Sequence, residues 1–328
     1  MDQLAIGVDL GGTSIKCALV SRRTGLVHQA SRDTEAARGP EVVLDNMAGL
    51  IKMMMERAEG PVLGAGVGSP GIINWDRTTV SEPPNLPGWK TVHLGEALSG
   101  RIGVPLEVLV ENDANAAGLG SAHYGAGKPF DSFIMVTLGT GVGGAIIYQN
   151  RIFRGASGGA GELGHMTIDY EGPVDNHDIP GASEAYLGQR FLSAHAARMA
   201  RQTPDSALND TIRERGDLEP HLIYQAAVKG DQTALEILEW AGHKLGVLLG
   251  SAVNLLDIRK VVVGGGLSAA GDFIFESART TIRQFVTHGL REGIEIIQEP
   301  RGNEVGVLGA AHLVFERVDD AVASSVGD

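Results

Sequence analysis

Two glycine-rich segments carry the residues best suited to binding phosphate. They run from Gly7 to Thr13 and from Thr137 to Gly144, and Asp9 and Lys16 flank the first turn. Each segment lies between two apolar strands. Glycine turns let a ligand approach the backbone closely and present N–H groups to anions. Two such turns in one chain predict a site that grips a polyphosphate, although each turn taken alone is more typical of an ordinary hairpin.

The second segment also matches a dinucleotide-binding fingerprint, G-x-G-x-x-G, through Gly139, Gly141 and Gly144. That fingerprint requires a strand before it and a helix after it. The apolar run from Ala145 to Tyr148 predicts a strand instead, which excludes a nicotinamide or flavin fold. The chain has no G-x-x-x-x-G-K-[ST] sequence, so a P-loop is excluded as well.

Composition bounds the class of protein. The 328 residues are 43% hydrophobic and 20% charged, as expected for a globular protein with a full core. The net charge of −13 disfavours nucleic acid and anionic membranes as partners. Cys17 is the single cysteine, which excludes an intrachain disulfide and favours the reducing cytoplasm. We identify no signal peptide and no membrane span.

The elements that must position these turns follow an α/β pattern that occurs twice. Strands at 4–10, 15–20 and 26–30 precede an amphipathic helix at 40–58, and the pattern restarts at Phe133 with its own strand, turn and strand. This repetition predicts the duplication of one α/β unit. Further helices are expected at 182–200, 220–229, 231–256 and 305–316, and the tail from Asp319 is expected to be frayed.

Five motifs, in this order, resemble those of the ROK family of sugar kinases, within the actin/hexokinase/heat-shock-70 ATPase superfamily. They are Asp9-Leu10-Gly11-Gly12-Thr13 with Lys16, Glu111-Asn112-Asp113-Ala114, Leu138-Gly139-Thr140-Gly141, Gly161-Glu162-Leu163-Gly164-His165 and Gly264-Gly265-Gly266. The resemblance implies a two-domain actin-like (ribonuclease H-like) α/β fold, with duplicated mixed sheets flanked by helices and a deep interdomain cleft. The expected domains are 1–117, completed by the C-terminal helix at about 305–328, and 118–304.

The resemblance implies ATP and Mg²⁺ as cofactors. Backbone at the two turns is expected to hold phosphate oxygens, and Asp9 is expected to hold Mg²⁺ through water. Adenine and ribose are expected to lie against the bare turn that follows a buried strand. The nucleotide residues so implied are Asp9, Gly11, Gly12, Thr13, Lys16, Gly139, Thr140, Gly141, Gly264, Gly265 and Gly266.

Asp113 is the expected general base. A sugar hydroxyl becomes a good nucleophile when a base removes its proton, and Asp113 stands where a strand meets a helix. The alternative is that Asp113 serves as the helix N-cap, a position that aspartate favours.

The resemblance further implies a sugar clamp that includes Asn112, Glu162, His165 and Glu184, with Gly71 bringing backbone to the sugar. Acceptors and donors of this kind suit vicinal hydroxyls. The alternatives are a core histidine for His165, a surface helix residue for Glu184 and a simple turn for Gly71.

The chain departs from the family at its zinc motif. The three cysteine positions of that motif are Asp175, His177 and Ala182 here, and only His165 among the four ligands is kept. We therefore expect no structural zinc. The segment is expected to be held by packing and hydrogen bonds, including an ion pair or turn bond between Asp175 and His177. A degenerate site at His165, Asp175 and His177 is the alternative.

The expected activity is ATP-dependent phosphorylation of a hexose, first of all glucose at the 6-hydroxyl. N-acetylmannosamine, N-acetylglucosamine and fructose stay open as substrates. The family also includes sugar-sensing transcriptional regulators, but their helix-turn-helix precedes the first glycine motif, and here the first strand starts at residue 4. A homodimer or homotetramer is expected from the family.

Overall fold

The computed structural model describes residues 2–326 and divides into two compact units. Unit 1 comprises the chain up to Asp131, residues 145–161 and the C-terminal segment from Asn303. Unit 2 comprises residues 132–144 and 162–302. The boundary expected at residue 118 falls inside one continuous helix, so unit 1 extends beyond it.

Unit 1 is built on a five-stranded sheet with the order β3-β2-β1-β4-β8. Strand β1 pairs antiparallel with β2 and parallel with β4, and β4 pairs parallel with β8. The strands are β1 (Leu4–Leu10), β2 (Ser14–Ser21), β3 (Gly25–Asp33), β4 (Val62–Ser69) and β8 (Val108–Asn112). A small sheet follows β4, with β5 (Ile72–Ile73), β6 (Thr79–Ser81) and β7 (Thr91–His93).

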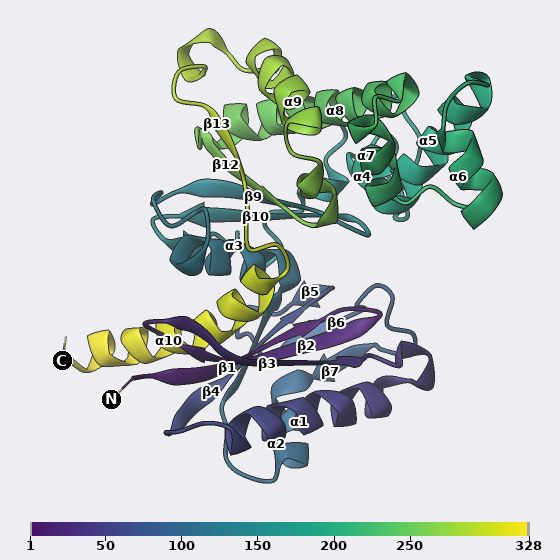
Figure 1. Ribbon diagram of the computed structural model, residues 1–328. Helices are drawn as coiled ribbons and strands as arrows, with labels where there is room; N and C mark the ends of the chain where they lie inside the picture. The colour runs from purple at the N-terminus through teal and green to yellow at the C-terminus, as the bar shows by residue number, and fades with distance from the viewer. Residues whose placement is uncertain (1, 327–328) are drawn as a thin grey trace. The chain divides into compact units, whose positions relative to one another are not determined.

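Helices cover both faces of the unit 1 sheet (Figure 1). Because side chains alternate along a strand, Ile6 and Val8 of β1 face one way and Ala5 faces the other. The first pair belongs to a core with α1 (Pro40–Glu56) and α2 (Leu94–Ile102). Ala5 belongs to a second core with α10 (Glu304–Val326), beside which lies α3 (Asp113–Tyr124). Burial on both faces explains why β1 is apolar along most of its length.

Helix α10 approaches the sheet and α3 backbone to backbone. A Cβ on Gly309 would overlap the carbonyl oxygen of Ala116 in α3, and a Cβ on Gly7 in β1 would overlap that of Val307. Only glycine leaves room for helix and strand axes this close. These contacts hold the C-terminal helix in unit 1.

The C-terminal helix continues to Val326, so the expectation of a frayed tail from Asp319 was wrong for the described residues. Two ion pairs anchor the segment. Arg22 lies 2.6 Å from Asp319, and Arg151 lies 2.6 Å from Asp320. Residues 327 and 328 lie outside the described part.

The second sheet has the order β11-β10-β9-β12-β13. Its strands are β9 (Phe133–Leu138), β10 (Val142–Tyr148), β11 (Arg151–Ile152), β12 (Lys260–Gly264) and β13 (Glu295–Gln298). Strand β12 pairs parallel with both β9 and β13. Each sheet thus begins with a strand, a glycine turn and a strand, as the duplication predicts.

Unit 2 contains most of the helices of the second half. Its helices are α4 (Glu184–Leu187), α5 (Gln189–Gln202), α6 (Leu208–Arg215), α7 (Pro220–Val228), α8 (Gln232–Leu256) and α9 (Asp272–Phe285). The helix expected at 182–200 is interrupted at Gly188, whose backbone is extended. Short 3-10 turns are η1 (Ala36–Arg38), η2 (Leu163–His165), η3 (Gly266–Ala270) and η4 (His288–Leu290).

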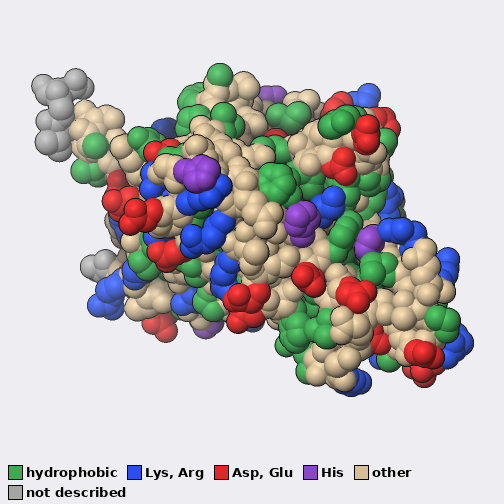
Figure 2. Space-filling model, turned by 90° about the horizontal axis from the view of Figure 1, so that it is seen from above, with side chains coloured by type: hydrophobic (Ala, Val, Ile, Leu, Met, Phe, Trp, Pro, Cys, Tyr) green, Lys and Arg blue, Asp and Glu red, His purple; other side chains and the backbone are tan. Residues whose placement is uncertain are grey.

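Acidic and basic side chains are interspersed over the face of the molecule in Figure 2. No helix among residues 2–326 is long and apolar enough to cross a membrane.

Gly309→Ala is expected to destabilise the protein by about 1–3 kcal/mol, because the methyl group forces α10 away from α3. The midpoint of urea unfolding measures this loss. Gly100→Ala in α2 is the control, since a Cβ there meets nothing within 4 Å and alanine favours a helix. Equal stability of the two variants would contradict the packing argument.

Candidate active site

The first glycine turn joins β1 to β2. Its backbone is closed by the N–H of Gly11, which donates to the carbonyl of Ser14 at 3.1 Å. Thr34, which directly follows β3, makes two hydrogen bonds to the turn. Its hydroxyl donates to the carbonyl of Gly11 at 2.6 Å, and its N–H donates to the carbonyl of Thr13 at 2.8 Å. These contacts fix the shape of the turn from the side of β3. Sequence patterns did not identify Thr34.

Asp9 and Lys16 face each other across this hairpin. They are paired in the register of β1 and β2, and Lys16 Nζ lies 3.8 Å from Asp9 Oδ2. Desolvation raises the pKa of Asp9 to about 6, against the lowering effect of Lys16, and the negative charge of Asp113 raises it further. One lysine at this distance leaves the Asp9 charge only partly compensated, which suits a carboxylate that receives a cation.

The junction of β8 and α3 shows which residue caps the helix, a role that the sequence left open for Asp113. Asn112 is the N-cap of α3, and its side-chain oxygen accepts from the N–H groups of Ala114 at 2.9 Å and Asn115 at 3.2 Å. Asp113 is the first residue of the helix and is exposed. The alternative of Asp113 as the helix cap is therefore wrong, because Asn112 holds that position.

The Asp113 carboxylate also contacts the start of the helix, since its Oδ1 accepts from the N–H of Ala114 at 2.9 Å. Desolvation raises its pKa above the ordinary value, and the N–H groups of Ala114 and of Asp113 itself lower it only in part. Desolvation therefore favours uptake of a proton by Asp113. A carboxylate of this kind is a suitable general base.

Glu111, one residue before the cap, is fully buried and organises the junction. Its Oε2 lies 3.0 Å from Arg77 Nε and 2.9 Å from Arg154 Nε. Its Oε1 accepts from the N–H of Asn112 and from the side-chain amide of Asn115. Both arginines were absent from the sequence prediction, since they lie far from the motif along the chain.

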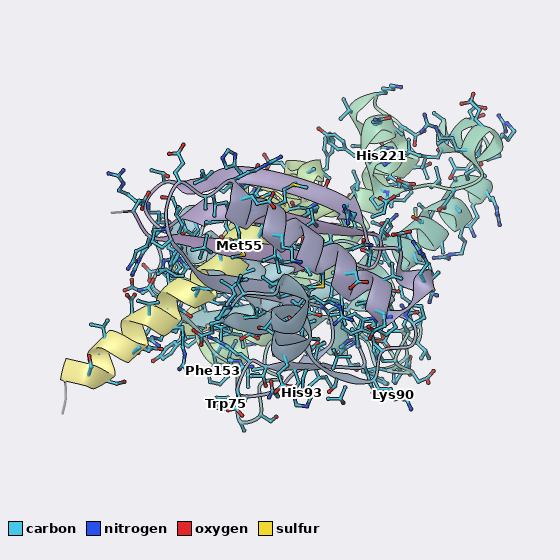
Figure 3. The ribbon with its side chains drawn as sticks, turned by 90° about the horizontal axis from the view of Figure 1, so that it is seen from below. Met55, Trp75, Lys90, His93, Phe153 and His221 are labelled. Carbon is cyan, nitrogen blue, oxygen red and sulfur yellow. The ribbon has the colours of Figure 1, made fainter. Side chains whose placement is uncertain are left out.

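Arg154 also ties two surface segments of unit 1 together. Its guanidinium donates to the carbonyls of Trp75 at 2.6 Å and Asn74 at 2.9 Å, and lies over the Trp75 ring at 5.2 Å. Trp75 and Phe153, which precedes Arg154, are marked close together in Figure 3. The buried carboxylate thereby fixes the loop between β5 and β6 relative to β8.

Gly71 lies in the turn between β4 and β5. Its φ is +96°, and a Cβ would meet Pro83 Cα and the carbonyl oxygen of Ser81 at 2.8 Å. The turn alone requires glycine here. A role of Gly71 beside a sugar stays a prediction.

The second glycine turn, between β9 and β10, is supported from the start of the nearby helices. Gly139 N–H donates to the carbonyl of Gly141 at 3.0 Å. The N–H of Gln189, at the start of α5, donates to the carbonyls of Gly139 and Thr140. This contact explains the break at Gly188, which frees the first turn of α5 to meet the loop.

Glu184, expected in the sugar clamp, contacts the second glycine turn. Its Oε2 accepts from the N–H of Val142 at 3.0 Å, and a Cβ on Gly141 would overlap the same oxygen. Its other oxygen lies 3.5 Å from the Asn176 side-chain amide. Glu184 therefore links the expected phosphate loop to the segment that follows His165.

Glu162 and His165 are brought together by η2. His165 Nε2 lies 3.9 Å from Glu162 Oε2, and both side chains are partly exposed. The opposite nitrogen of His165, Nδ1, lies 2.9 Å from the carboxylate of Asp175. The pair presents two polar atoms at a spacing that suits neighbouring hydroxyls.

The third glycine segment follows β12. Gly265 has a φ of +83°, and a Cβ there would overlap the backbone of Leu138 at the end of β9. A Cβ on Gly266 would meet nothing within 4 Å. The fold thus demands glycine at 265, whereas the open surface at 266 is free for a flat ligand.

The predicted residues are shared by the two units. Unit 1 contains Asp9, Gly11, Gly12, Thr13, Lys16, Gly71, Asn112 and Asp113. Unit 2 contains Gly139, Thr140, Gly141, Glu162, His165, Glu184, Gly264, Gly265 and Gly266. The glycines expected to bind phosphate lie at the turn between β1 and β2 in unit 1 and at the turn that follows β9 in unit 2.

Comparisons with known proteins identify the family of this chain. The ROK family pattern matches residues 5–317. The chain belongs to the ROK family. It is 34% identical to the glucokinase of Streptomyces coelicolor over 323 residues, covering 95% of this chain and 98% of the relative. The solved structure of a ROK family glucokinase from Streptomyces griseus, in complex with glucose and AMPPNP, matches with a TM-score of 0.83 and 31% identity, covering 94% of this chain and 98% of that one.

Regulators are found among the relatives as well. The xylose repressor of Caldicellulosiruptor bescii is 30% identical over 283 residues, which cover 85% of this chain and 70% of the repressor. The glucokinase relatives, by contrast, are matched along nearly their whole length. The chain is a sugar kinase with the actin-like ATPase fold.

Glu111→Gln is expected to lower the free energy of unfolding by about 3 kcal/mol, because it leaves Arg77 and Arg154 facing a neutral amide in a buried position. Urea unfolding measures the loss. Glu107→Gln is the control, since its ion pair with Arg317 is solvent-exposed and contributes at most about 1 kcal/mol. A Glu111 variant as stable as the control would show that this charge does not organise the junction.

Gly139→Ala is expected to leave the fold intact but to raise KM for ATP about tenfold or more, because its Cβ meets no protein atom within 4 Å and would instead obstruct a phosphate. Gly289→Ala in η4, also in open space, should leave ATP kinetics unchanged. Unchanged KM in both variants would place the phosphates elsewhere.

Proposed function

We propose that the protein transfers the terminal phosphoryl group of ATP to a hexose, with the 6-hydroxyl of glucose as the first candidate acceptor. The proposal rests chiefly on the position and the environment of the Asp113 carboxylate. It is an exposed carboxylate with a raised pKa, in a motif shared with sugar kinases, and Asn112 rather than Asp113 is the N-cap residue of the helix. The names of the glucokinase relatives support the choice of hexose.

Asp113 would act as general base. Its carboxylate accepts the proton of the sugar hydroxyl while the hydroxyl oxygen forms a bond to the terminal phosphorus of ATP. The bond between that phosphorus and the bridging oxygen breaks, and ADP leaves. Positioned proton transfer of this kind contributes about 10²–10⁴-fold to a rate. The remaining catalysis comes from positioning and from charge stabilisation of the phosphoryl group.

The nucleotide would be held by backbone more than by charge. The glycine turns at 11–13 and 139–141 would offer phosphate oxygens their N–H groups other than those of Gly11 and Gly139, which close the turns. Gly266 would offer open backbone to adenine and ribose. The chain has a net charge of −13, and backbone N–H groups would allow it to bind phosphates with few cationic side chains. Lys16 adds one positive charge beside the first turn.

Mg²⁺ fits the chemistry of Asp9. Carboxylate oxygen is a preferred ligand of Mg²⁺, and nucleotide sites commonly use one or two carboxylates, with waters and phosphates as the other ligands. The raised pKa of Asp9 indicates a carboxylate whose charge is incompletely compensated in the protein alone. When bound, the cation would neutralise charge on the ATP phosphates.

The sugar would be recognised by Glu162 and His165, with a contribution from Asn112. Because the side-chain oxygen of Asn112 is used by the helix cap, it would contact the sugar through its amide nitrogen. Glu184 would contribute chiefly by holding the turn at Val142. Groups that hydrogen-bond substrate hydroxyls discriminate strongly against analogues that lack them.

N-acetylmannosamine, N-acetylglucosamine and fructose are the alternative acceptors, and sugar-dependent regulation is the alternative of a different class. A coupled ADP-release assay with these sugars and glucose separates them. Turnover with glucose exceeding the others supports the proposal, and turnover with none of them contradicts it.

Asp113→Asn is expected to lower kcat by at least about 10²-fold while the dissociation constants of glucose and ATP change little. In the wild type, kcat should fall as the pH falls, because Asp113 must be deprotonated. Since burial raises its pKa, the midpoint of the decline should lie above the ordinary aspartate value of 3.8. Near-normal turnover of the variant would remove Asp113 from the role of base.

Asn112→Ala is the companion variant that reports on the helix cap. It should lower the free energy of unfolding by about 1 kcal/mol, whereas Asp113→Asn should leave it almost unchanged. The reverse result would mean that Asp113 supports the helix.

A further inference from the structure

The segment from His165 to Glu184 replaces the zinc motif of the family with a different kind of structure. Asp175, His177 and Ala182 occupy the three positions of the missing cysteines. Structural zinc sites have four ligands, usually including thiolates. Ala182 supplies no ligand atom, and no group of three or more His, Cys, Asp or Glu side chains within residues 2–326 is arranged to hold a metal. The donor set does not fit a structural zinc ion.

The Asp175 carboxylate, at the first of the three cysteine positions, makes hydrogen bonds to the surrounding segment. Its Oδ1 accepts from the N–H groups of His177 at 2.8 Å and Ile179 at 2.9 Å. Its Oδ2 lies 2.9 Å from His165 Nδ1. The side chain has no exposed surface, so all of its partners are protein groups. The turn bond expected between Asp175 and His177 is confirmed, in the form of a backbone N–H donating to the carboxylate.

The backbone around Asp175 closes into a small hairpin. The N–H of Asp175 donates to the carbonyl of Ile179 at 3.1 Å, and the N–H of Gly181 donates to the carbonyl of Pro173 at 2.8 Å. Val174 and Pro180 form an isolated bridge between the two arms. A turn that is closed by its own backbone and filled by a carboxylate needs no metal to keep its shape.

Asp175 remains ionised at neutral pH. Burial alone would raise its pKa, but the N–H of Ile179, the hydrogen bond with His165 and the N–H of His177 outweigh burial and lower it below the ordinary value. The carboxylate is therefore a hydrogen-bond acceptor at both oxygens.

An ionised acceptor at Nδ1 decides which nitrogen of His165 carries the hydrogen. A neutral imidazole has one N–H donor and one acceptor nitrogen, and the partner of one nitrogen selects the tautomer. Because a carboxylate can only accept, the tautomer of the neutral ring that fits this contact has Nδ1–H donating to Asp175 and the lone pair on Nε2. Nε2 is on the side of Glu162, 3.9 Å from its carboxylate, and the His165 side chain is 26% exposed there. The His177 ring packs edge-on against that of His165 at 4.4 Å and limits its rotation.

We propose that Asp175 is a positioning residue that takes over the task of a structural metal, holding His165 in the orientation and tautomer in which Nε2 accepts a hydrogen bond from a sugar hydroxyl. The inference rests on the proposed function, since it assumes that His165 binds the sugar. It implies that hexose binding by this protein is independent of zinc.

Asp175→Asn tests the inference because it keeps the size of the side chain and one acceptor oxygen for the hairpin. Its amide nitrogen would face His165 Nδ1 as a donor, which favours the tautomer with hydrogen on Nε2. In ¹⁵N NMR of the histidine rings, the wild type should show His165 protonated at Nδ1 and the variant at Nε2. The dissociation constant for glucose should rise roughly 10- to 100-fold. KM for ATP and the unfolding midpoint should change little.

Asp178→Asn is the matched control, since Asp178 is an exposed aspartate in the same hairpin. It should leave the His165 tautomer and glucose affinity at wild-type values. An Asp175 variant that keeps both properties as well would overturn the inference. The same holds for a variant that loses glucose affinity only in step with a lower unfolding midpoint, because that is a purely structural role.

Zinc content is the second, independent measurement. Protein purified from zinc-supplemented cultures and dialysed against a chelator should hold less than about one zinc ion per ten chains and keep its glucose affinity. Zinc near one per chain would overturn the metal-free hairpin. If the wild type phosphorylates no hexose, the proposed function fails on that assay, whereas the NMR measurement still decides whether Asp175 orients His165.

Discussion

The Glu111 carboxylate, fully buried between Arg77 and Arg154, is the interaction on which the catalytic end of unit 1 depends. Glu111 directly precedes the N-cap residue Asn112 and the first helical residue Asp113. The position of Glu111 therefore determines where these two side chains lie. Burying a charge is costly unless opposite charges and hydrogen bonds surround it. Here the two arginines and two N–H donors supply them, and the same contacts draw the loop between β5 and β6 to the end of β8.

Unit 2 uses carboxylates in a related way. Glu184 accepts a backbone N–H from the second glycine turn, and Asp175 accepts two from its own hairpin as well as the ring hydrogen of His165. Loops whose N–H groups have no partner in a helix or sheet must find other acceptors. Glu184 and Asp175 therefore stabilise loop backbone in unit 2. Carboxylates that are fixed in this way also orient the groups expected to meet the sugar.

The sequence predicted the arrangement of strands and glycine turns because apolar runs and glycine punctuation are local signals. It also predicted the family, since five short motifs kept their order along the chain. It did not predict Thr34, Arg77 or Arg154 as supports, because each acts on a motif far away in the sequence. The helix at 182–200 was predicted as continuous because its break at Gly188 depends on a contact with the turn at Gly139. The tail was predicted to fray because its anchors, Arg22 and Arg151, lie in other elements.

The sequence by itself determined three features of this protein. They are the glycines that permit the turns, the Asp113 carboxyl group in its motif, and the absence of the three cysteines that a thiolate-rich metal site requires. The tertiary structure decided how such residues divide their roles. Asn112 caps the helix and leaves Asp113 exposed, Glu184 holds a turn, and Asp175 holds an imidazole. The physical reason is that a side chain's chemistry is set by its type, whereas its partners, burial and pKa are set by groups that only folding brings within hydrogen-bonding distance.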